Sequence, residues 1–437
     1  MDSDEVRVRV APSPTGMLHI GTAQSALYNV LFARHHGGKF LVRIEDTDIE
    51  RSEKRFEDDI LEGLKWLGLQ WDELYHQRER APIHTTYIQK LLDEKKAFYC
   101  SHTKEELEAE KLAHVCNQKD QHFTEGIIRL NVPTGSKRKI KFHDIIRGDM
   151  EFEEGLIGDF SIAKNPQTPL FHFAVVVDDF EMKITHVIRG EDHLANTPKH
   201  VLIQEALGFP VPQYAHLPLM LGADRSKLSK RHGAVSLSMY REQGFLPEAI
   251  VNYLGILGYT PPEGKEIISR DELVQVFDLA KVHKSGAIFD IKKLEWINGE
   301  YLKKMSDPDL LKFIGEKYEM ILPLVRERMK KKKDLEEFDF FFNSPTVDPE
   351  LLKWKKASLE ESKAMLMKVG EVLKECEWSK EAISYKLEAR SSATGDRGLV
   401  YWPLRVALSG RKASPDPVDI AVILGKEEVL KRIENAL

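Results

Sequence analysis

The N-terminal part of the chain alternates between strand-like and helix-like segments, and this alternation limits the fold more than any other feature. Residues 6–10 (VRVRV) alternate like a half-buried strand, and residues 18–34 carry apolar side chains near helical spacing. Residues 40–46 (FLVRIED) predict a second strand, and residues 54–67 predict a second helix. Strands separated by helices in this way predict a parallel sheet with crossover helices, which is an α/β fold.

The rest of the chain departs from this pattern in two places. Residues 85–180 hold a charged helical patch at 103–114 and short strand-like runs, so they predict an α+β insertion. Residues 171–179 (FHFAVVVDD) and 184–193 predict a return to buried strands. After about residue 236 the patterns are almost all helical, which predicts an all-α region. The predicted regions are 1–84 with 181–237, the insertion 85–180, and the helical regions 238–307 and 308–437.

Composition narrows the class of protein. The chain has 437 residues and a formal net charge of −6, which argues against a uniformly basic nucleic-acid binder but leaves room for a local basic patch. Its three cysteines, Cys100, Cys116 and Cys376, cannot make a disulfide framework. No apolar run is long enough to cross a bilayer, and the N-terminus has no secretory pattern. We expect a cytoplasmic protein with no membrane partner.

The loop RVAPSPTGMLHIGT (residues 9–22) follows the first predicted strand. That is the sheet edge at which open α/β folds bind ligands, and the helix that starts near His19 offers an anion site at its N-terminus. Gly21 lets a ligand approach the backbone, and His19 and Thr22 lie on one helix face. These features predict a phosphate site, although a tight turn with a surface histidine fits the spacing equally well.

A second loop, LGADRSKLSKRHGAV (residues 221–235), places Lys227 and Lys230 beside serines and a glycine. A cationic loop of this kind can fold over a triphosphate and stabilise the charge that develops on phosphate oxygens. Taken alone, the loop fits a solvated basic turn better. Together with the His19 loop, it favours a nucleotide site.

These two loops resemble the HIGH and KMSKS signatures of class I aminoacyl-tRNA synthetases. Further stretches resemble the glutamyl-tRNA synthetase family in the right order, nearly from end to end: FLVRIEDTD (40–48), VVVDD (175–179), THVIRGEDHLANTPKH (185–200), GFLPEAIVNYLGILG (244–258) and PLRVALSG (403–410). The resemblance implies a Rossmann-like catalytic domain with an acceptor-binding connective insertion. A stem-contact helical domain and an all-α anticodon-binding region are then expected to follow.

The implied activity is that of a glutamate–tRNA ligase. Such an enzyme activates L-glutamate with ATP and Mg²⁺ to glutamyl-adenylate, and then transfers glutamate to the 3′ end of tRNA(Glu). In this family glutamate binding is generally active only once tRNA is bound. Charging of tRNA(Gln) remains open, and a monomer is expected. The main alternative is a catalytically inactive synthetase-like RNA-binding regulator, against which the intact HIGT and KLSKR segments argue.

The resemblance also implies the site residues. Those expected to bind ATP are His19, Gly21, Thr22, Asp192, Lys227, Leu228 and Lys230, and all but Asp192 and Leu228 are expected to be catalytic. Those expected to bind glutamate are Arg9, Ala11, Ser13, Glu45, Phe171, Arg189 and His193. Arginine matches a carboxylate with two donors, and Glu45 would hold the α-ammonium. Arg7 is expected only on a solvated strand face, a position that the alternation also allows for Arg9.

Two departures from the family pattern stand out. Phe171 replaces the usual tyrosine and His172 the usual asparagine, so either a glutamate contact is lost or the phenyl ring keeps the packing. Many relatives also carry Cys and His zinc ligands in the insertion. The candidates here are Cys100, His102, Cys116 and His122, but their spacing is irregular and favours a site that no longer holds zinc.

The helical C-terminal part is expected to contact the anticodon. Relatives specific for glutamate usually carry an arginine there that reads the last anticodon base. Arg328, within RERMKKKK (326–333), is the best match to that position, and Arg405 is a second candidate. The lysine run itself fits phosphate contacts or a solvated helix face.

Overall fold

The computed structural model describes residues 5–48, 50–102, 106, 114–121, 123–133, 135–229, 231 and 236–437. The chain forms two compact units, residues 1–297 and 298–437. The four regions predicted from the sequence are a finer division, and their boundaries stay predictions. The helical patch predicted at 103–114 falls almost entirely outside the described residues.

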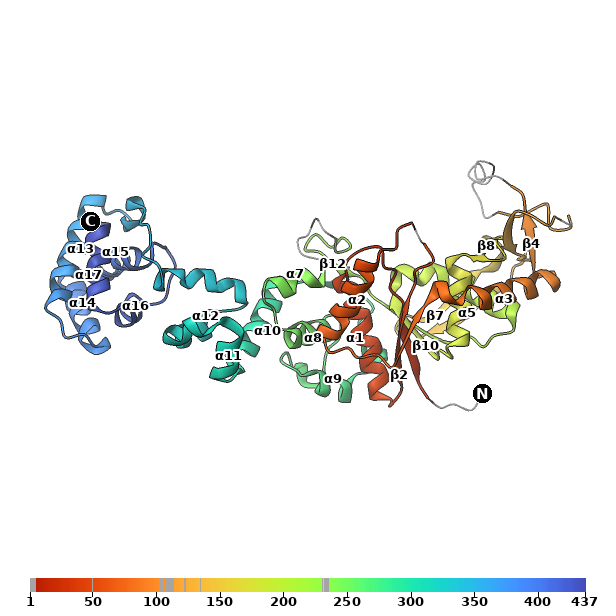
Figure 1. The fold of residues 1–437 in the computed structure, drawn as a ribbon, viewed down its shortest axis with the longest axis horizontal. Helices are drawn as coiled ribbons and strands as arrows, with labels where there is room; N and C mark the ends of the chain where they lie inside the picture. The colour runs from red at the N-terminus through yellow and green to blue at the C-terminus, as the bar shows by residue number, and fades with distance from the viewer. Residues whose placement is uncertain are drawn as a thin grey trace. The chain divides into compact units, whose positions relative to one another are not determined.

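The first unit begins with the predicted strand–helix–strand–helix order, drawn in red and orange in Figure 1. Strands β1 (Arg7–Val10), β2 (Lys39–Ile44) and β3 (Glu73–His76) form a parallel sheet in the order β1-β2-β3. Helix α1 (Ile20–His35) connects β1 to β2, and α2 (Lys54–Trp66) precedes β3. The predicted α/β fold with crossover helices is therefore confirmed.

The expectation that β1 is half buried is wrong. All four of its residues are buried, including Arg7 and Arg9. The Arg7 guanidinium donates to both carboxylate oxygens of Glu73 at 2.8 and 2.9 Å, so Arg7 does not lie on a solvated face. An arginine can occupy a buried strand position when a carboxylate compensates its charge, and here both arginines of β1 have one.

A second group of strands continues beside β1. Strands β10 (His186–Gly190), β11 (Gln213–Leu217), β6 (Lys139–Asp144) and β7 (Gly148–Glu153) pair in that order, and only the β6–β7 pair is antiparallel. The Thr185 amide donates to the Arg7 carbonyl at 2.9 Å and so joins the start of β10 to β1. The carboxyl ends of β1, β10 and β11 therefore meet at one edge.

The segment at 171–179 is not a strand, as the sequence analysis expected, but helix α5 (Phe171–Glu181). Its residues from Phe173 to Asp179 are all buried. Because a run buried on every side has no amphipathic period, its apolar sequence suits a buried strand and a buried helix equally. The helix turns Asp178 and Asp179 toward different partners, which are Arg80 and His84 for the first and Arg9 and Arg43 for the second.

The insertion supplies an antiparallel sheet in the order β4-β5-β8-β9, formed by β4 (Ala97–Cys100), β5 (Ile127–Leu130), β8 (Ser161–Asn165) and β9 (Thr168–Pro169). Helices α3 (Ala81–Asp93), α5 and α6 (Thr197–Leu207) contribute to the same hydrophobic core. That core includes Ile88, Ile128 and Phe173, each fully buried.

The last part of the first unit is mostly helical. A short parallel pair, β12 (Met220–Leu221) and β13 (Ala287–Ile288), accompanies α7 (Leu237–Glu242), α8 (Pro247–Ile256) and α9 (Arg270–Val276). The division between the two units falls inside α10 (Ile291–Lys304). The prediction that strands nearly vanish after residue 236 is confirmed for the described residues.

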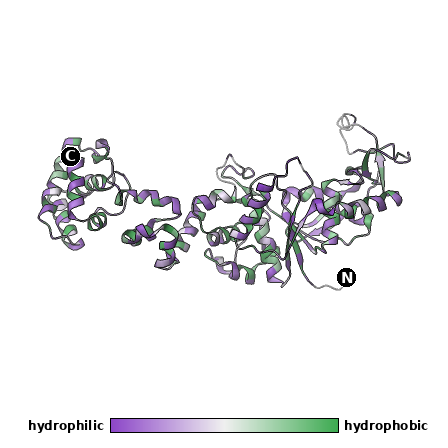
Figure 2. Ribbon diagram, in the orientation of Figure 1, coloured by the Kyte–Doolittle hydropathy of each residue, from purple (hydrophilic) through white to green (hydrophobic). Residues whose placement is uncertain are grey.

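The second unit is all-α, as predicted. Its helices are α11 (Asp307–Ile314), α12 (Leu322–Arg328), α13 (Leu359–Lys374), α14 (Lys380–Thr394), α15 (Arg397–Ser409), α16 (Pro417–Leu424) and α17 (Lys426–Ala436). Hydrophobic and hydrophilic residues alternate around these helices in Figure 2. The buried faces include Val369, Leu404 and Ile433. Across the described parts of both units, no helix has the length and apolar character needed to cross a membrane.

Candidate active site

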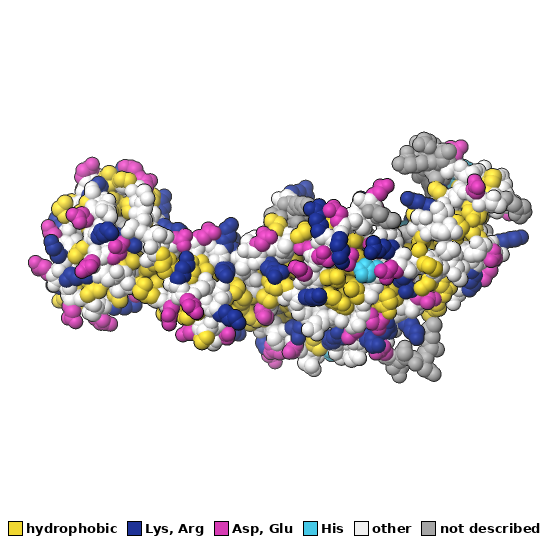
Figure 3. Space-filling view, in the orientation of Figure 1, with side chains coloured by type: hydrophobic (Ala, Val, Ile, Leu, Met, Phe, Trp, Pro, Cys, Tyr) yellow, Lys and Arg dark blue, Asp and Glu magenta, His cyan; other side chains and the backbone are white. Residues whose placement is uncertain are grey.

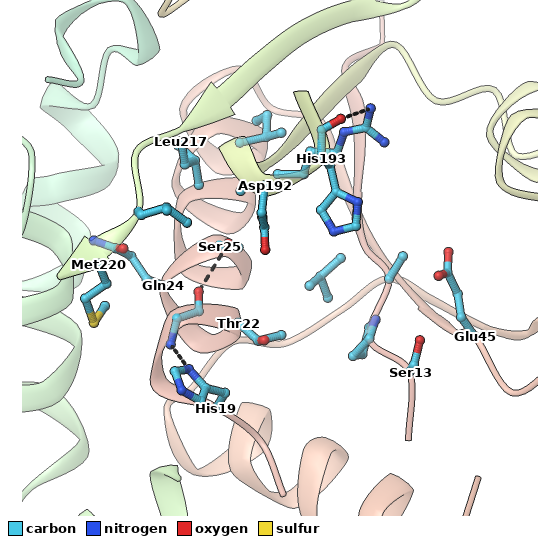
Figure 4. A pocket seen from close by; sticks show the side chains of 18 of the residues that line it. Ser13, His19, Thr22, Gln24, Ser25, Glu45, Asp192, His193, Leu217 and Met220 are labelled. Carbon is cyan, nitrogen blue, oxygen red and sulfur yellow. Dashed lines mark hydrogen bonds between the residues drawn. The ribbon is translucent and has the colours of Figure 1, made fainter. Parts of the chain in front are cut away.

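A cavity of about 470 Å³ opens where β1, β10 and β11 end. Every described residue predicted to bind ATP or glutamate lines it, and these come from five separate stretches: Arg9, Ala11, Ser13, His19, Gly21, Thr22, Glu45, Phe171, Arg189, Asp192, His193, Lys227 and Leu228. Lys230 lies outside the described residues. In Figure 4, Asp192 and His193 lie above His19 and Thr22, which mark the start of α1. Ser13 and Glu45 lie to the right of these residues in the same view.

His19 is the N-cap of α1. Its Nδ1 accepts a hydrogen bond from the Gly21 amide at 3.1 Å, and burial and the nearby Lys227 lower the pKa of its imidazole. A neutral imidazole that accepts at Nδ1 carries its proton on Nε2, so His19 can donate to a ligand. The N-terminal amides of α1 add further donors for an anion at the same end of the cavity.

Lys227 reaches the cavity from a tight hairpin after β12. The Gly222 amide donates to the Ser226 carbonyl at 2.8 Å, and the Leu228 amide donates to the Met220 carbonyl at 2.9 Å. The Lys227 Nζ donates to Asp192 Oδ2 at 2.8 Å, and this contact outweighs burial and lowers the pKa of the carboxyl. The Lys227 ammonium group and the N-terminus of α1 thus face the same space.

Arg9 is neutralised within the protein. Its Nε and Nη2 donate to the two oxygens of Asp179 at 3.0 and 3.1 Å, and Arg43 Nη1 donates to Asp179 Oδ1 at 2.7 Å. Burial alone would raise the pKa of Asp179, but the two arginines outweigh it and lower that pKa. Glu45 accepts from Arg43 Nη2 at 3.1 Å, and burial raises the pKa of its carboxyl. The four side chains form a buried charge network beside the cavity.

Arg189, near the end of β10, differs from Arg9 in the kind of group to which its guanidinium donates. Its guanidinium donates to His216 Nε2 at 3.2 Å and Thr197 Oγ1 at 2.9 Å, and a further nitrogen lies 3.3 Å from His200 Nδ1. Burial lowers its pKa to about 10. Among the described residues, no carboxylate lies within ion-pairing distance of this guanidinium. Its charge is therefore available to an anionic ligand.

Of the two residues that depart from the family pattern, Phe171 lines the cavity and His172 lies behind it, against His200. Phe171 lines the cavity and keeps 38% of its surface exposed, with its ring centroid 5.9 Å from that of His193. The neighbouring His172 places Nδ1 3.2 Å from His200 Nε2. Burial lowers the pKa of His172 to about 4, so it is neutral near pH 7.

A separate cluster joins Cys100, His102, His114 and Cys116. One ligand atom from each lies within 4.8 Å of every other. Three of the four candidates from the sequence, Cys100, His102 and Cys116, belong to this cluster, and His114 is a member that the sequence did not suggest; the fourth candidate, His122, lies outside the described residues and stays a prediction. Asp159 holds the loop in place, since it accepts from the Cys116 amide at 2.9 Å and its own amide donates to the His114 carbonyl at 2.7 Å.

Comparison with known families identifies the family to which this chain belongs. The family described as "tRNA synthetases class I (E and Q), catalytic domain" matches residues 5–296. The chain belongs to this class I tRNA synthetase family. A second family, described as "Anticodon binding domain", matches residues 287–437. The two matches cover the two structural units, and the resemblance drawn from the HIGT and KLSKR loops is confirmed.

Relatives match this class I synthetase over almost its whole length. The chain is 43% identical to "Glutamate--tRNA ligase 2" of Thermoanaerobacter pseudethanolicus, with 99% of this chain and 98% of the relative covered. It is 42% identical to "Glutamate--tRNA ligase" of Aquifex aeolicus, with 99% of each covered. A crystal structure of a glutamate tRNA ligase from Elizabethkingia meningosepticum, in complex with its amino acid, matches with a TM-score of 0.84 and 34% identity over 99% of each chain.

In the anticodon-binding unit, the two predicted tRNA contacts lie near each other. Arg328 is exposed at the end of α12. Arg405 lies on α15 and donates to Ser414 Oγ and the Pro415 carbonyl, each at 2.9 Å. Burial lowers the pKa of Arg405, and the charge of Arg328 lowers it further. The two guanidinium groups are therefore close enough for their charges to interact.

The residues that hold Arg9 and Arg189 in place were not predicted from the sequence. These are Arg43, Asp144, Asp179, His200 and His216, all buried. A charged or imidazole side chain within an apolar strand, such as His216 in YAHL, was the available signal. The partners could not be paired, since Asp144 and His216 lie far apart in the chain. The face drawn in Figure 3 mixes basic and acidic side chains, so surface charge gives no simple guide to these sites.

Proposed function

We propose that the protein is a glutamate–tRNA ligase that forms glutamyl-adenylate from glutamate and ATP and transfers glutamate to tRNA(Glu). The observation that carries this proposal is the division of one cavity into two ends. His19, Gly21, Thr22 and Lys227 lie at an end suited to phosphate, and the unneutralised Arg189 lies on β10. Neither chemical step needs a covalent enzyme intermediate, so positioning and electrostatic stabilisation carry the catalysis.

At the phosphate end, His19 Nε2 and the amides of α1 bind the ATP phosphates. Lys227 exchanges its contact with Asp192 for the α-phosphate and the departing diphosphate, together with Lys230. Mg²⁺ bound with ATP would offset the negative charge of the phosphates at this end, and we assign it no side-chain ligand.

At the amino-acid end, Arg189 attracts a carboxylate of glutamate by its charge, Arg9 in its pair with Asp179 contributes a hydrogen-bond donor, and Glu45 holds the α-ammonium. Ala11 and Ser13 line the floor, and Phe171 and His193 close one wall. Support comes from the contrast between the two arginines, because Arg9 already pairs with Asp179 while the described residues offer Arg189 no carboxylate. The insertion is assigned to the acceptor end of tRNA and residues 238–307 to its stem. A monomer and a cytoplasmic location stay predictions.

The direct test is charging of purified tRNA(Glu) and, separately, tRNA(Gln) with labelled glutamate and ATP. Charging of tRNA(Glu) alone means an enzyme that discriminates between the two tRNAs. Charging of both means a non-discriminating enzyme. If neither is charged and diphosphate exchange is absent with and without tRNA, the proposal fails and an inactive RNA-binding regulator becomes the better interpretation. No observation on the described residues favours that alternative.

Arg328 gives the first prediction for the tRNA end. Arg328→Ala is expected to raise the KM for tRNA about tenfold, since loss of an arginine contact to a base costs about 1–3 kcal/mol. The variant should leave diphosphate exchange with saturating tRNA unchanged. Charging kinetics with tRNA(Glu) measure the effect, and Lys386→Ala on α14 serves as an exposed control. An unchanged KM would exclude Arg328 as a contact.

We also propose that Cys100, His102, His114 and Cys116 bind one Zn²⁺, contrary to the expectation from spacing. Two thiolates and two imidazoles are a common structural zinc set, with Zn–S of about 2.3 Å and Zn–N of about 2.0 Å. Cys100 Sγ lies 3.2 Å from His102 Nδ1 and 3.9 Å from His114 Nε2, and Cys116 Sγ lies 3.6 Å from His102 Nδ1. These separations fit the edges of such a tetrahedron.

Metal content tests the zinc site without reference to activity. The purified protein is expected to carry about one zinc per chain by elemental analysis, and the Cys100→Ser/Cys116→Ser double variant to carry almost none. Cys376→Ser is a matched control, because Cys376 is also buried but lies in the other unit. Equal zinc content in the double variant and the unmodified protein would contradict the site.

A further inference from the structure

Arg189 is held by neutral groups rather than by an anion. The side chain is 8% exposed, and its partners are His216, His200, the Thr197 hydroxyl and the His193 carbonyl at 3.4 Å. A buried cation usually pairs with a carboxylate, as Arg9 and Arg43 do with Asp179. The partners of Arg189 must therefore orient the guanidinium without cancelling its charge.

The first of two hydrogen-bond chains runs from Asp144 through His216 to Arg189. A guanidinium N–H can only donate, so His216 Nε2 must accept and its proton must lie on Nδ1. That nitrogen lies 2.6 Å from Asp144 Oδ2, which accepts the proton. Asp144 is itself fixed, because its carboxylate accepts the amides of His216 at 3.0 Å and Arg147 at 2.8 Å.

The second chain runs from Arg189 through His200 to His172. His200 Nδ1 lies 3.3 Å from an Arg189 nitrogen and must also accept. Its proton then lies on Nε2 and is donated to His172 Nδ1 at 3.2 Å. His172 thereby satisfies the Nε2–H of the tautomer that Arg189 requires. Burial lowers the pKa values of both imidazoles, which is consistent with two neutral rings.

We propose that His172, His200 and His216 are positioning residues that fix Arg189 through two chains of neutral imidazoles and keep its charge available for a substrate carboxylate. The role rests on the proposed function, in which that substrate is glutamate. Each imidazole aims a lone pair at a guanidinium N–H, so the planar fork is oriented before the ligand arrives. The charged and titratable groups that surround the chains are Arg9, Glu45, Arg147, Asp179, His193, Lys199 and Tyr214.

The tautomers are tested first, because their measurement needs no activity. Long-range ¹⁵N–¹H NMR of histidine-labelled protein is expected to show His216 protonated at Nδ1 and His200 and His172 protonated at Nε2. In the His172→Phe variant the His200 Nε2–H loses its acceptor, so its ¹⁵N and ¹H shifts should move while Arg189 keeps Nδ1 unprotonated. Protonation of His200 at Nδ1 or of His216 at Nε2 in the unmodified protein would overturn the proposal.

The second readout separates glutamate binding from the rest of the reaction. His172→Phe and His200→Phe are expected to raise the KM for glutamate about tenfold, with the KM for ATP and kcat changed less than about twofold. His172→Asn restores an acceptor oxygen near the position of Nδ1 and is expected to recover most of the loss. His186→Phe is a matched control, since His186 is a half-buried histidine on β10 that does not line the active-site cavity.

The outcomes separate this proposal from the proposed function. A rise in the KM for ATP equal to that for glutamate, or no recovery by His172→Asn, would mean that the histidines only support the fold and would contradict positioning. Unmodified protein that fails to charge tRNA with glutamate would sink the proposed function instead. The NMR tautomers would then still decide whether the two chains exist.

Discussion

Replacing Lys227 by alanine is expected to slow glutamyl-adenylate formation by about 10²–10³-fold, the loss that follows removal of one group aimed at charge in a transition state. The lysine lines the cavity with His19 and is held 2.8 Å from Asp192. Because the charge on the α-phosphate grows as the diphosphate leaves, the lost interaction should lower kcat more than it changes the KM for ATP. Diphosphate exchange in the presence of tRNA measures both.

A lysine outside the cavity provides the control for this result. Lys265 is exposed and pairs with Glu272 on the surface, so Lys265→Ala should leave kcat within about twofold of the unmodified protein. Asp192→Asn adds a second comparison, because it frees Lys227 without removing its charge. If Lys227→Ala changed only the KM for ATP, the lysine would bind ground-state phosphate and would not act on the reacting group.

The second large effect concerns stability and centres on Asp179. Asp179→Asn is expected to lower the free energy of unfolding of the first unit by about 3–5 kcal/mol, which is the usual cost of removing one partner of a buried ion pair. The carboxylate compensates two buried guanidinium groups, Arg9 at 3.0 Å and Arg43 at 2.7 Å. Its loss would leave both charges out of water, with Glu45 at 3.1 Å and Asp178 at 4.0 Å from Arg43 as the remaining carboxylates beside that arginine. Urea unfolding, with hydrogen exchange of the β1 and β2 amides, measures the change.

The matched control for Asp179 is an acidic residue of the same unit that forms only a surface pair. Asp58 lies 3.2 Å from Lys54 on α2 and its side chain is 56% exposed, so Asp58→Asn should cost less than about 1 kcal/mol. If Asp179→Asn cost no more than the control, the buried network would not be a major support of the sheet edge. Asp179→Asn should also raise the KM for glutamate, because Arg9 loses its fixed orientation.

Much of the candidate site could be predicted from the sequence because its residues lie in short, continuous stretches. Arg9 to Thr22 form one loop between a strand and a helix, and Lys227 and Leu228 belong to another. Loops that follow the strands of a parallel sheet all lie at its carboxyl edge, so the strand order alone brings these stretches close together. The histidine expected near the start of the first helix is indeed its N-cap.

The sequence by itself determined the alternation of β1, α1, β2 and α2, the helical second unit and the two loops of the site, because each depends on periodicity or on neighbours in the chain. Tertiary structure decided whatever depends on partners far away in the chain. It made residues 171–179 a helix, since a run buried on every side has no period to show its form. It paired Arg9 with Asp179, 170 residues away, chose His114 for the cysteine cluster, and set Asp144 behind His216. A buried charge or imidazole needs a hydrogen-bond or ion-pair partner wherever the fold places it, and the neighbouring sequence does not indicate which distant residue that partner is.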